Sequence, residues 1–169
     1  KRAYGVLSVD AFSIINDTIS TARRVLPPGT HEVDNSELRG TFSAPWQLYY
    51  FALLSNGMGY RAQTNGASFE FFFEGGRGFA LETYIHRLGG DYTVCIEEDM
   101  MGGDSICHKH SNAPLGISTI PAYKVFRPFM GFDPVKRYKV TVTVTSIPTL
   151  STLIGDVIID SIVVFPPSL

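Results

Sequence analysis

The sequence has little charge. Asp, Glu, Lys and Arg make up 18% of its 169 residues, against roughly a quarter in a typical soluble domain. The 14 Lys and Arg nearly balance the 16 Asp and Glu, which leaves a formal net charge of −2. No basic excess is available to neutralise a phosphate backbone or an anionic lipid surface. This balance argues against nucleic acid as a partner.

The sequence also lacks a continuous apolar run that could cross a bilayer. The longest candidate, residues 154–165, is interrupted by Gly155, Asp156 and Asp160. A spanning helix needs about 18 uninterrupted apolar residues. We therefore expect no membrane insertion.

Helical segments are missing as well. Only residues 18–25 could form a short helical turn, which Pro27-Pro28-Gly29 would end. The chain has instead about ten short stretches rich in β-branched and aromatic residues, separated by Gly, Pro and Asn turns. At this length the pattern predicts a single all-β domain over 1–169, an antiparallel β-sandwich or jelly roll.

Several strands can be placed by alternation. Phe69, Phe71 and Phe73 share one face of residues 67–74, so this stretch is predicted to be a core strand. In the next strand Tyr84 and His86 lie on the face opposite Phe79, Leu81 and Ile85. Valines alternate with threonines over 140–145, and the last strand spans 156–165.

The two cysteines are predicted to form a disulfide. Tyr92, Val94 and Ile96 point inward in one strand and Ile106 in the next, so Cys95 and Cys107 both point outward. If the two strands form a hairpin, their register allows a bridge across it. Disulfides favour oxidising compartments, which predicts an extracellular or cell-surface protein. Asn16-Asp17-Thr18 matches the N-glycosylation pattern, with a polar turn as the alternative for Asn16.

Three motifs together resemble a known family. In each, the alternating residues of a strand are preceded or followed by glycine: Phe69-x-Phe71-x-Phe73-x-Gly75, Gly89-Gly90-x-Tyr92-x-Val94-x-Ile96 and Gly155-Asp156-x-Ile158-x-Asp160-x-Ile162. This resembles the galactose-binding-like jelly rolls, the fold of many carbohydrate-binding modules and discoidin-type domains. The resemblance covers about 30–165 and leaves 1–29 as an N-terminal strand or arm outside the family core. It implies a mostly non-catalytic protein that attaches to glycans, lipids or other proteins.

The sequence contains no motif that indicates an enzyme. No serine lies in a G-x-S-x-G elbow, and no glycine-rich loop fits a phosphate or dinucleotide site. We therefore assign no catalytic residue and expect no organic cofactor.

Two groups of residues could bind a metal. Glu97, Asp99 and Asp104 could supply oxygen ligands to Ca²⁺, but the loop lacks the regular D-x-D-x-D-G spacing of a dedicated site, and the alternative is a solvated hairpin tip. His108 and His110 would share one face of a strand and could chelate a transition metal. Ordinary polar decoration of a strand is the alternative.

Sugar binding has the better physical case, because aromatic rings stack on pyranoses while polar groups fix the hydroxyls. Tyr49 and Tyr50 are among the aromatic candidates; the alternative for them and for Trp46 is packing in the core or at its rim, which the pattern favours for Trp46. The residues we assign to a binding surface are Trp46, Tyr60, Tyr84, His86 and Arg87.

Two functions follow from these observations. The first is an extracellular, non-catalytic module that recognises glycans through aromatic and polar surface residues. The alternative is a structural subunit of a filament, coat or appendage, whose copies associate through strand edges such as residues 46–54 and the N-terminal arm. The expected partner is a glycan or other copies of the chain.

Overall fold

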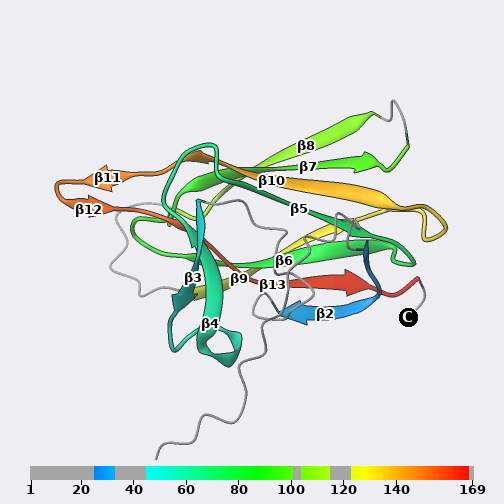
Figure 1. The fold of residues 1–169 in the computed structure, drawn as a ribbon, viewed down its shortest axis with the longest axis horizontal. Coiled ribbons are helices and arrows are strands. Elements are labelled where there is room, and N and C mark those ends of the chain that lie inside the picture. Colours follow the sequence, from blue (N-terminus) through cyan, green and yellow to red (C-terminus); the bar gives the residue numbers. More distant parts are fainter. Residues whose placement is uncertain (1–24, 33–44, 101–103, 115–122, 168–169) are drawn as a thin grey trace, which may run out of the picture.

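The computed structural model describes residues 25–32, 45–100, 104–114 and 123–167. This part of the chain consists of β-strands, loops and one 3₁₀ turn, arranged as two facing sheets (Figure 1). Residues 1–24 of the predicted N-terminal strand or arm, which include Asn16 and most of the helical turn over 18–25, lie outside the described residues. No helix in the described ranges is long and apolar enough to span a membrane.

The first sheet has five strands in the order β1-β5-β10-β7-β8. Its neighbours are antiparallel except for β1 and β5, which run parallel. The strands are β1 (Val25–Leu26), β5 (Ser68–Phe73), β10 (Tyr138–Ser146), β7 (Asp91–Glu98) and β8 (Ser105–Ser111).

The second sheet has the order β3-β4-β13-β6-β9, and β2 also pairs with β13. All of its pairings are antiparallel. The strands are β2 (Gly29–Glu32), β3 (Trp46–Tyr50), β4 (Met58–Ala62), β6 (Gly78–Ile85), β9 (Tyr123–Met130) and β13 (Val157–Phe165). A small hairpin of β11 (Thr149–Leu150) and β12 (Leu153–Ile154) projects from one end of the sandwich (Figure 1).

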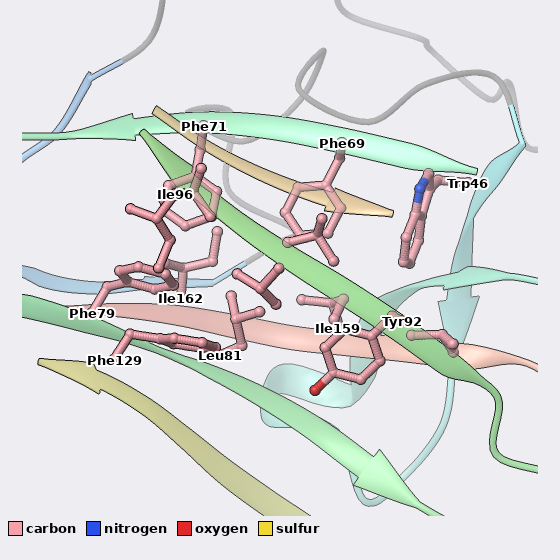
Figure 2. Close-up of a cluster of buried hydrophobic side chains, with 14 of the residues drawn as sticks. Trp46, Phe69, Phe71, Phe79, Leu81, Tyr92, Ile96, Phe129, Ile159 and Ile162 are labelled. Atoms are coloured by element: carbon pink, nitrogen blue, oxygen red, sulfur yellow. The ribbon is translucent and has the colours of Figure 1, made fainter. Parts of the chain in front are cut away.

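The core lies between the sheets and follows from the alternation of side chains. Phe69, Phe71 and Phe73 point inward from β5, as predicted, and the β10 valines are buried beside them. Trp46 packs edge-on against Phe69, with ring centroids 5.2 Å apart (Figure 2). The two sheets thus share one continuous apolar cluster.

A bulge in β13 sets the position of its polar residues. Thr83 of β6 pairs with Ile159, and the next residue, Glu82, pairs with Ser161, so Asp160 is an extra residue. The opposite edge of β13 pairs with β4 up to Ile159 and with β2 from Ser161 onward. Asp160 therefore lies where one neighbouring strand replaces another.

Two predictions about individual strands are wrong, one about exposure and one about length. Ile106 was expected to point into the core, but it is 60% exposed because β8 is the edge strand of its sheet. Residues 46–54 were expected to form one strand, but β3 ends at Tyr50 and the chain then turns back through the 3₁₀ turn at Ser55–Gly57. Asn56 and Gly57 have positive φ angles of 51° and 73°, as a tight Asn-Gly turn requires.

Candidate functional site

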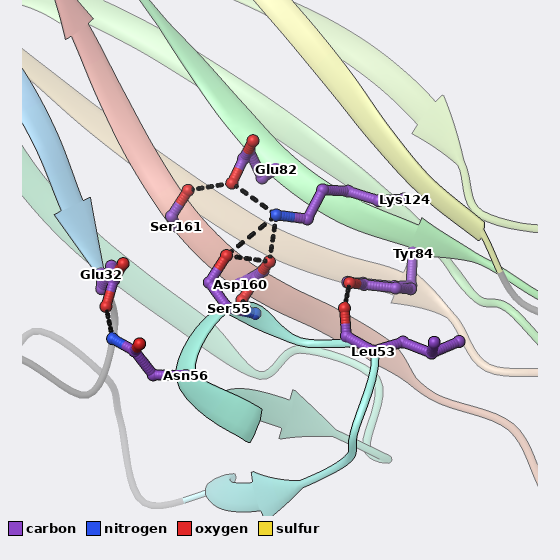
Figure 3. Close-up of polar contacts among 9 residues, drawn as sticks. All are labelled: Glu32, Leu53, Ser55, Asn56, Glu82, Tyr84, Lys124, Asp160 and Ser161. Carbon is purple, nitrogen blue, oxygen red and sulfur yellow. Dashed lines mark hydrogen bonds and ion pairs between the residues drawn. The ribbon is translucent and has the colours of Figure 1, made fainter.

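A polar cluster lies on the outer face of the six-stranded sheet, away from the core (Figure 3). Lys124 of β9 occupies its centre. The ammonium nitrogen lies 2.7 Å from Oδ2 of Asp160 and 3.0 Å from Oε2 of Glu82. Three neighbouring strands, β9, β6 and β13, thus each contribute one charged group.

Asp160 is the most buried member of this cluster. Its side chain is completely enclosed, yet it accepts hydrogen bonds from the backbone N–H of Ser55 at 2.9 Å and from the Ser55 hydroxyl at 3.1 Å. Together with Lys124 these donors compensate a charge that would otherwise be costly to bury.

The pKa of Lys124 reflects the same contacts. Burial by itself lowers the pKa, but hydrogen bonds and charge attraction from Asp160 and Glu82 outweigh it and raise the pKa to about 12. The lysine is therefore positively charged at neutral pH. Ser161, placed beside Asp160 by the bulge, donates its hydroxyl to Glu82.

The 51–57 segment, which connects β3 to β4, is held against this face. Ser55 binds Asp160 as described, the Tyr84 hydroxyl donates to the carbonyl of Leu53, and the Asn56 amide donates to Glu32 (Figure 3). Burial beneath the segment raises the pKa of Tyr84, and the nearby charge of Asp160 adds to the increase.

Aromatic rings adjoin the charged cluster. Tyr49 and Phe51 stack with centroids 6.1 Å apart, and Phe51 meets the Tyr84 ring edge-on at 6.5 Å. The Arg61 guanidinium carbon lies 4.4 Å from the centre of the Tyr49 ring. We call Tyr49, Phe51 and Arg61 the aromatic shelf. Tyr50, which lies between Tyr49 and Phe51 in the chain, points to the other side of the edge strand β3 and is 68% exposed.

The five residues predicted to bind sugar do not come together. Trp46 lies in the core and Tyr60 packs partly against it, while Tyr84 is enclosed on the outer face. His86 Nε2 lies 2.7 Å from Oδ1 of Asp156, and Arg87 is exposed in the following turn. With their rings enclosed, Trp46 and Tyr84 offer no face for stacking on a sugar.

The structure does not bring the three predicted Ca²⁺ ligands into one site. Glu97 lies 3.5 Å from the Lys139 ammonium, and Asp99 lies 3.6 Å from Arg137. Asp104 is exposed just before β8. Within the described ranges, no group of three His, Cys, Asp or Glu side chains could hold a metal ion.

The predicted disulfide is present. Cys95 of β7 and Cys107 of β8 are directly paired across the strands, with Cα atoms 4.1 Å apart, and bond through their sulfurs. This confirms the hairpin register inferred from the sequence.

The residues of the polar cluster were not predicted from the sequence. One indication was available, since Asp160 and Ser161 interrupt an otherwise apolar strand. A buried strand that carries two adjacent polar residues points to a bulge and to a charged partner. The partner, Lys124, lies on a strand that only the sheet order brings near.

Comparisons with known proteins agree on the fold. No protein-family model and no curated protein matches the sequence. A family 6 carbohydrate-binding module is similar over 85% of this chain and 97% of its own, with 13% identity and a TM-score of 0.51.

Two enzyme chains contain a similar domain. A two-domain esterase active on acetylated mannans, co-crystallised with mannopentaose, is similar over 83% of this chain but 37% of its own, with 11% identity and a TM-score of 0.55. A Paenibacillus xanthan lyase is similar over 82% of this chain and 13% of its own, with 12% identity and a TM-score of 0.53. The chain therefore shares the jelly-roll fold of these neighbours, as predicted, and in the two enzyme chains this fold is one part of a larger protein.

Proposed function

We propose that the chain is a non-catalytic carbohydrate-binding module that acts outside the cell. Its binding surface is the outer face of the six-stranded sheet, where the aromatic shelf adjoins Lys124 and Glu82. The fold shared with a carbohydrate-binding module supports the class of function, although a fold by itself does not identify a ligand.

The single observation that carries the proposal is the adjacency of rings and fixed polar groups. Tyr49 and Phe51 offer flat apolar surface, and Arg61, Lys124 and Glu82 offer hydrogen-bonding groups held by neighbouring strands. Pyranose rings carry an apolar face bordered by hydroxyls, so they match a surface of this kind.

The state of the acidic groups supports a binding role over a hydrolytic one. Glycoside hydrolysis commonly needs two carboxyl groups that can act as acid and as base or nucleophile. Asp160 is enclosed and Glu82 shares its lysine. Neither carboxylate is therefore free to act as the acid, base or nucleophile of a hydrolysis.

The disulfide supports the extracellular location. Cys107 lies on an exposed strand, where a reducing compartment would open the bond.

The test is a screen of the purified chain against immobilised plant, fungal and bacterial polysaccharides, followed by calorimetry with oligosaccharides of any that bind. We expect Tyr49→Ala and Phe51→Ala to weaken binding about tenfold, because a stacked ring contributes on the order of 1–2 kcal/mol. Tyr123→Ala is the matched control, since Tyr123 is an exposed tyrosine at the start of β9 and does not belong to the aromatic shelf. Equal losses in all three variants, or binding that survives Tyr49→Ala and Phe51→Ala unchanged, would exclude this surface.

A further inference from the structure

A second group of polar side chains lies at the side edge of the sandwich, between β8 and β9. These are the edge strands of the two sheets, and the described structure contains no hydrogen-bonded ladder between them. Arg127 of β9 crosses the gap and donates from Nη2 to the carbonyl of Ser111 at 3.0 Å. The guanidinium group of Arg127 therefore lies in the gap and links the two edge strands.

The gap contains buried polar atoms without a hydrogen-bond partner. They are Nε of Arg127, Nε2 of His110 and Nδ2 of Asn112. The Tyr92 hydroxyl lies beside them, within hydrogen-bonding reach of Thr83 and Arg127. Tyr92 and Asn112 are completely buried. Such atoms are costly to enclose unpaired, and in native proteins they usually face water or a ligand.

The four side chains are neighbours. The rings of Tyr92 and His110 stack with centroids 5.4 Å apart, and His110 in turn meets Phe129 at 5.4 Å. Asn112 accepts a hydrogen bond from Thr83 at 3.2 Å through Oδ1, which leaves its amide nitrogen free to donate. Figure 2 shows Tyr92 at the margin of the core cluster, with its hydroxyl directed away from the apolar centre.

The unpaired groups are mostly donors beside a positive charge. In the part of the chain that the structure describes, no carboxylate forms an ion pair with Arg127. Burial lowers the pKa of His110, and the Arg127 charge lowers it further, so the imidazole is neutral at pH 7. The guanidinium therefore has donors around it and no counter-charge.

We propose that the gap between β8 and β9 binds a carboxylate, held by Arg127 with Tyr92 and Asn112 as further donors. A carboxylate supplies several acceptor positions and the missing negative charge, and arginine is the side chain best suited to pair with it. A shallow hollow that reaches His110, lined also by Asp91, Lys109, Ser111 and Thr145, lies beside the site. The site is separate from the aromatic shelf and does not depend on it.

The carboxylate could belong to a free organic acid or to a uronic acid sugar, and titration separates the two. The His110 ring resonances would be followed by NMR at constant ionic strength while sodium acetate, sodium glucuronate or glucose is added. We expect saturable shifts with acetate and glucuronate and none with glucose. Tighter binding of glucuronate than of acetate would assign the site to an acidic glycan, and equal binding would assign it to carboxylates in general.

Variants locate the binding. Arg127→Gln should weaken carboxylate binding about tenfold or more, because a charge-assisted pair is lost. Tyr92→Phe, which removes one hydroxyl and keeps the ring, should weaken it severalfold. Arg77→Gln is the matched control, since Arg77 also has a buried, unpartnered Nε but lies just before β6, whereas Arg127 is paired with Leu81 within that strand. No saturable shift in the unaltered chain, or the same shift in Arg127→Gln and Arg77→Gln, would overturn the proposal and leave ordered water as the partner of these groups.

Discussion

The ammonium nitrogen of Lys124 lies 2.7 Å from a carboxylate oxygen of Asp160, whose side chain is completely buried. The two residues come from β9 and β13, which are separated in the sheet by β6. Their contact crosses the outer face of β6 and adds Glu82 to the same ammonium group. One lysine thus compensates two carboxylates and, through Ser55, helps hold the 51–57 segment.

Removing the lysine should destabilise the fold. Lys124→Met would leave Asp160 buried without its counter-charge, and we expect a loss of about 2–3 kcal/mol in the free energy of unfolding. This lies below the cost typical of fully buried pairs because the Lys124 side chain is 35% exposed and water screens it. Urea denaturation followed by the fluorescence of Trp46, the single tryptophan of the chain, measures the change.

Lys136→Met is the control for this prediction. Lys136 also lies 2.7 Å from a carboxylate, that of Glu98, but both side chains are more exposed. Surface pairs of this kind contribute at most about 1 kcal/mol. A Lys136→Met variant as unstable as Lys124→Met would contradict the importance given to the buried charge.

Stability should fall in alkaline solution. The pKa of Lys124 is raised to about 12 in the folded chain, against roughly 10.4 in an unfolded one. A raised lysine pKa stabilises the fold below the unfolded value, and this contribution is lost as the pH rises towards 12. The free energy of unfolding should therefore decrease between about pH 10.5 and 12.

A comparison with Lys124→Met isolates this part of the pH dependence. Tyr84 and Tyr92 also have raised pKa values, chiefly through burial, so their ionisation lowers stability in the same direction from about pH 10. The variant keeps the tyrosines and lacks the lysine. Its free energy of unfolding should decrease less steeply over this window, and parallel curves for the two proteins would refute the assignment to Lys124.

The disulfide should contribute to stability. Cys95 and Cys107 are separated by 12 residues, and closing a loop of that size in the unfolded chain is worth about 3 kcal/mol in the chain-entropy model. Replacing both cysteines with alanine should reduce the free energy of unfolding by about 2–3 kcal/mol. Thermal and urea unfolding of the variant, beside the unaltered chain with and without dithiothreitol, test this, and the reduced chain should match the variant. A chain whose stability is unaffected by reduction would show that the β7–β8 pairing suffices alone.

Local alternation made most of the fold predictable. The inward positions of Phe69, Phe71 and Phe73 are fixed by the two-residue period of a strand, and the β10 valines follow the same rule. The matching faces of Cys95 and Cys107 followed from the same period, which is why the disulfide could be inferred. The same rule gave a wrong prediction on an edge strand. Ile106 is on the inward side of β8 by alternation, but no other sheet covers it there.

The candidate binding surface was less predictable. Tyr84 was placed on the correct face, opposite Leu81, but it is enclosed because the 51–57 segment folds over it. Alternation states which side of a sheet a residue occupies and carries no information about what lies above it. For this reason a buried tyrosine was assigned to ligand binding, and Lys124 and Arg61 were overlooked.

The sequence by itself determined the all-β class, the core strands and the pairing of the cysteines, because each depends on the order of residues within one or two neighbouring strands. Only the tertiary structure decided which polar residues meet. Strand order brought Lys124 to Asp160 across β6, and the facing edges of β8 and β9 brought Arg127 to Tyr92. Both groupings join strands distant in sequence, whose proximity depends on how the whole chain buries its apolar faces.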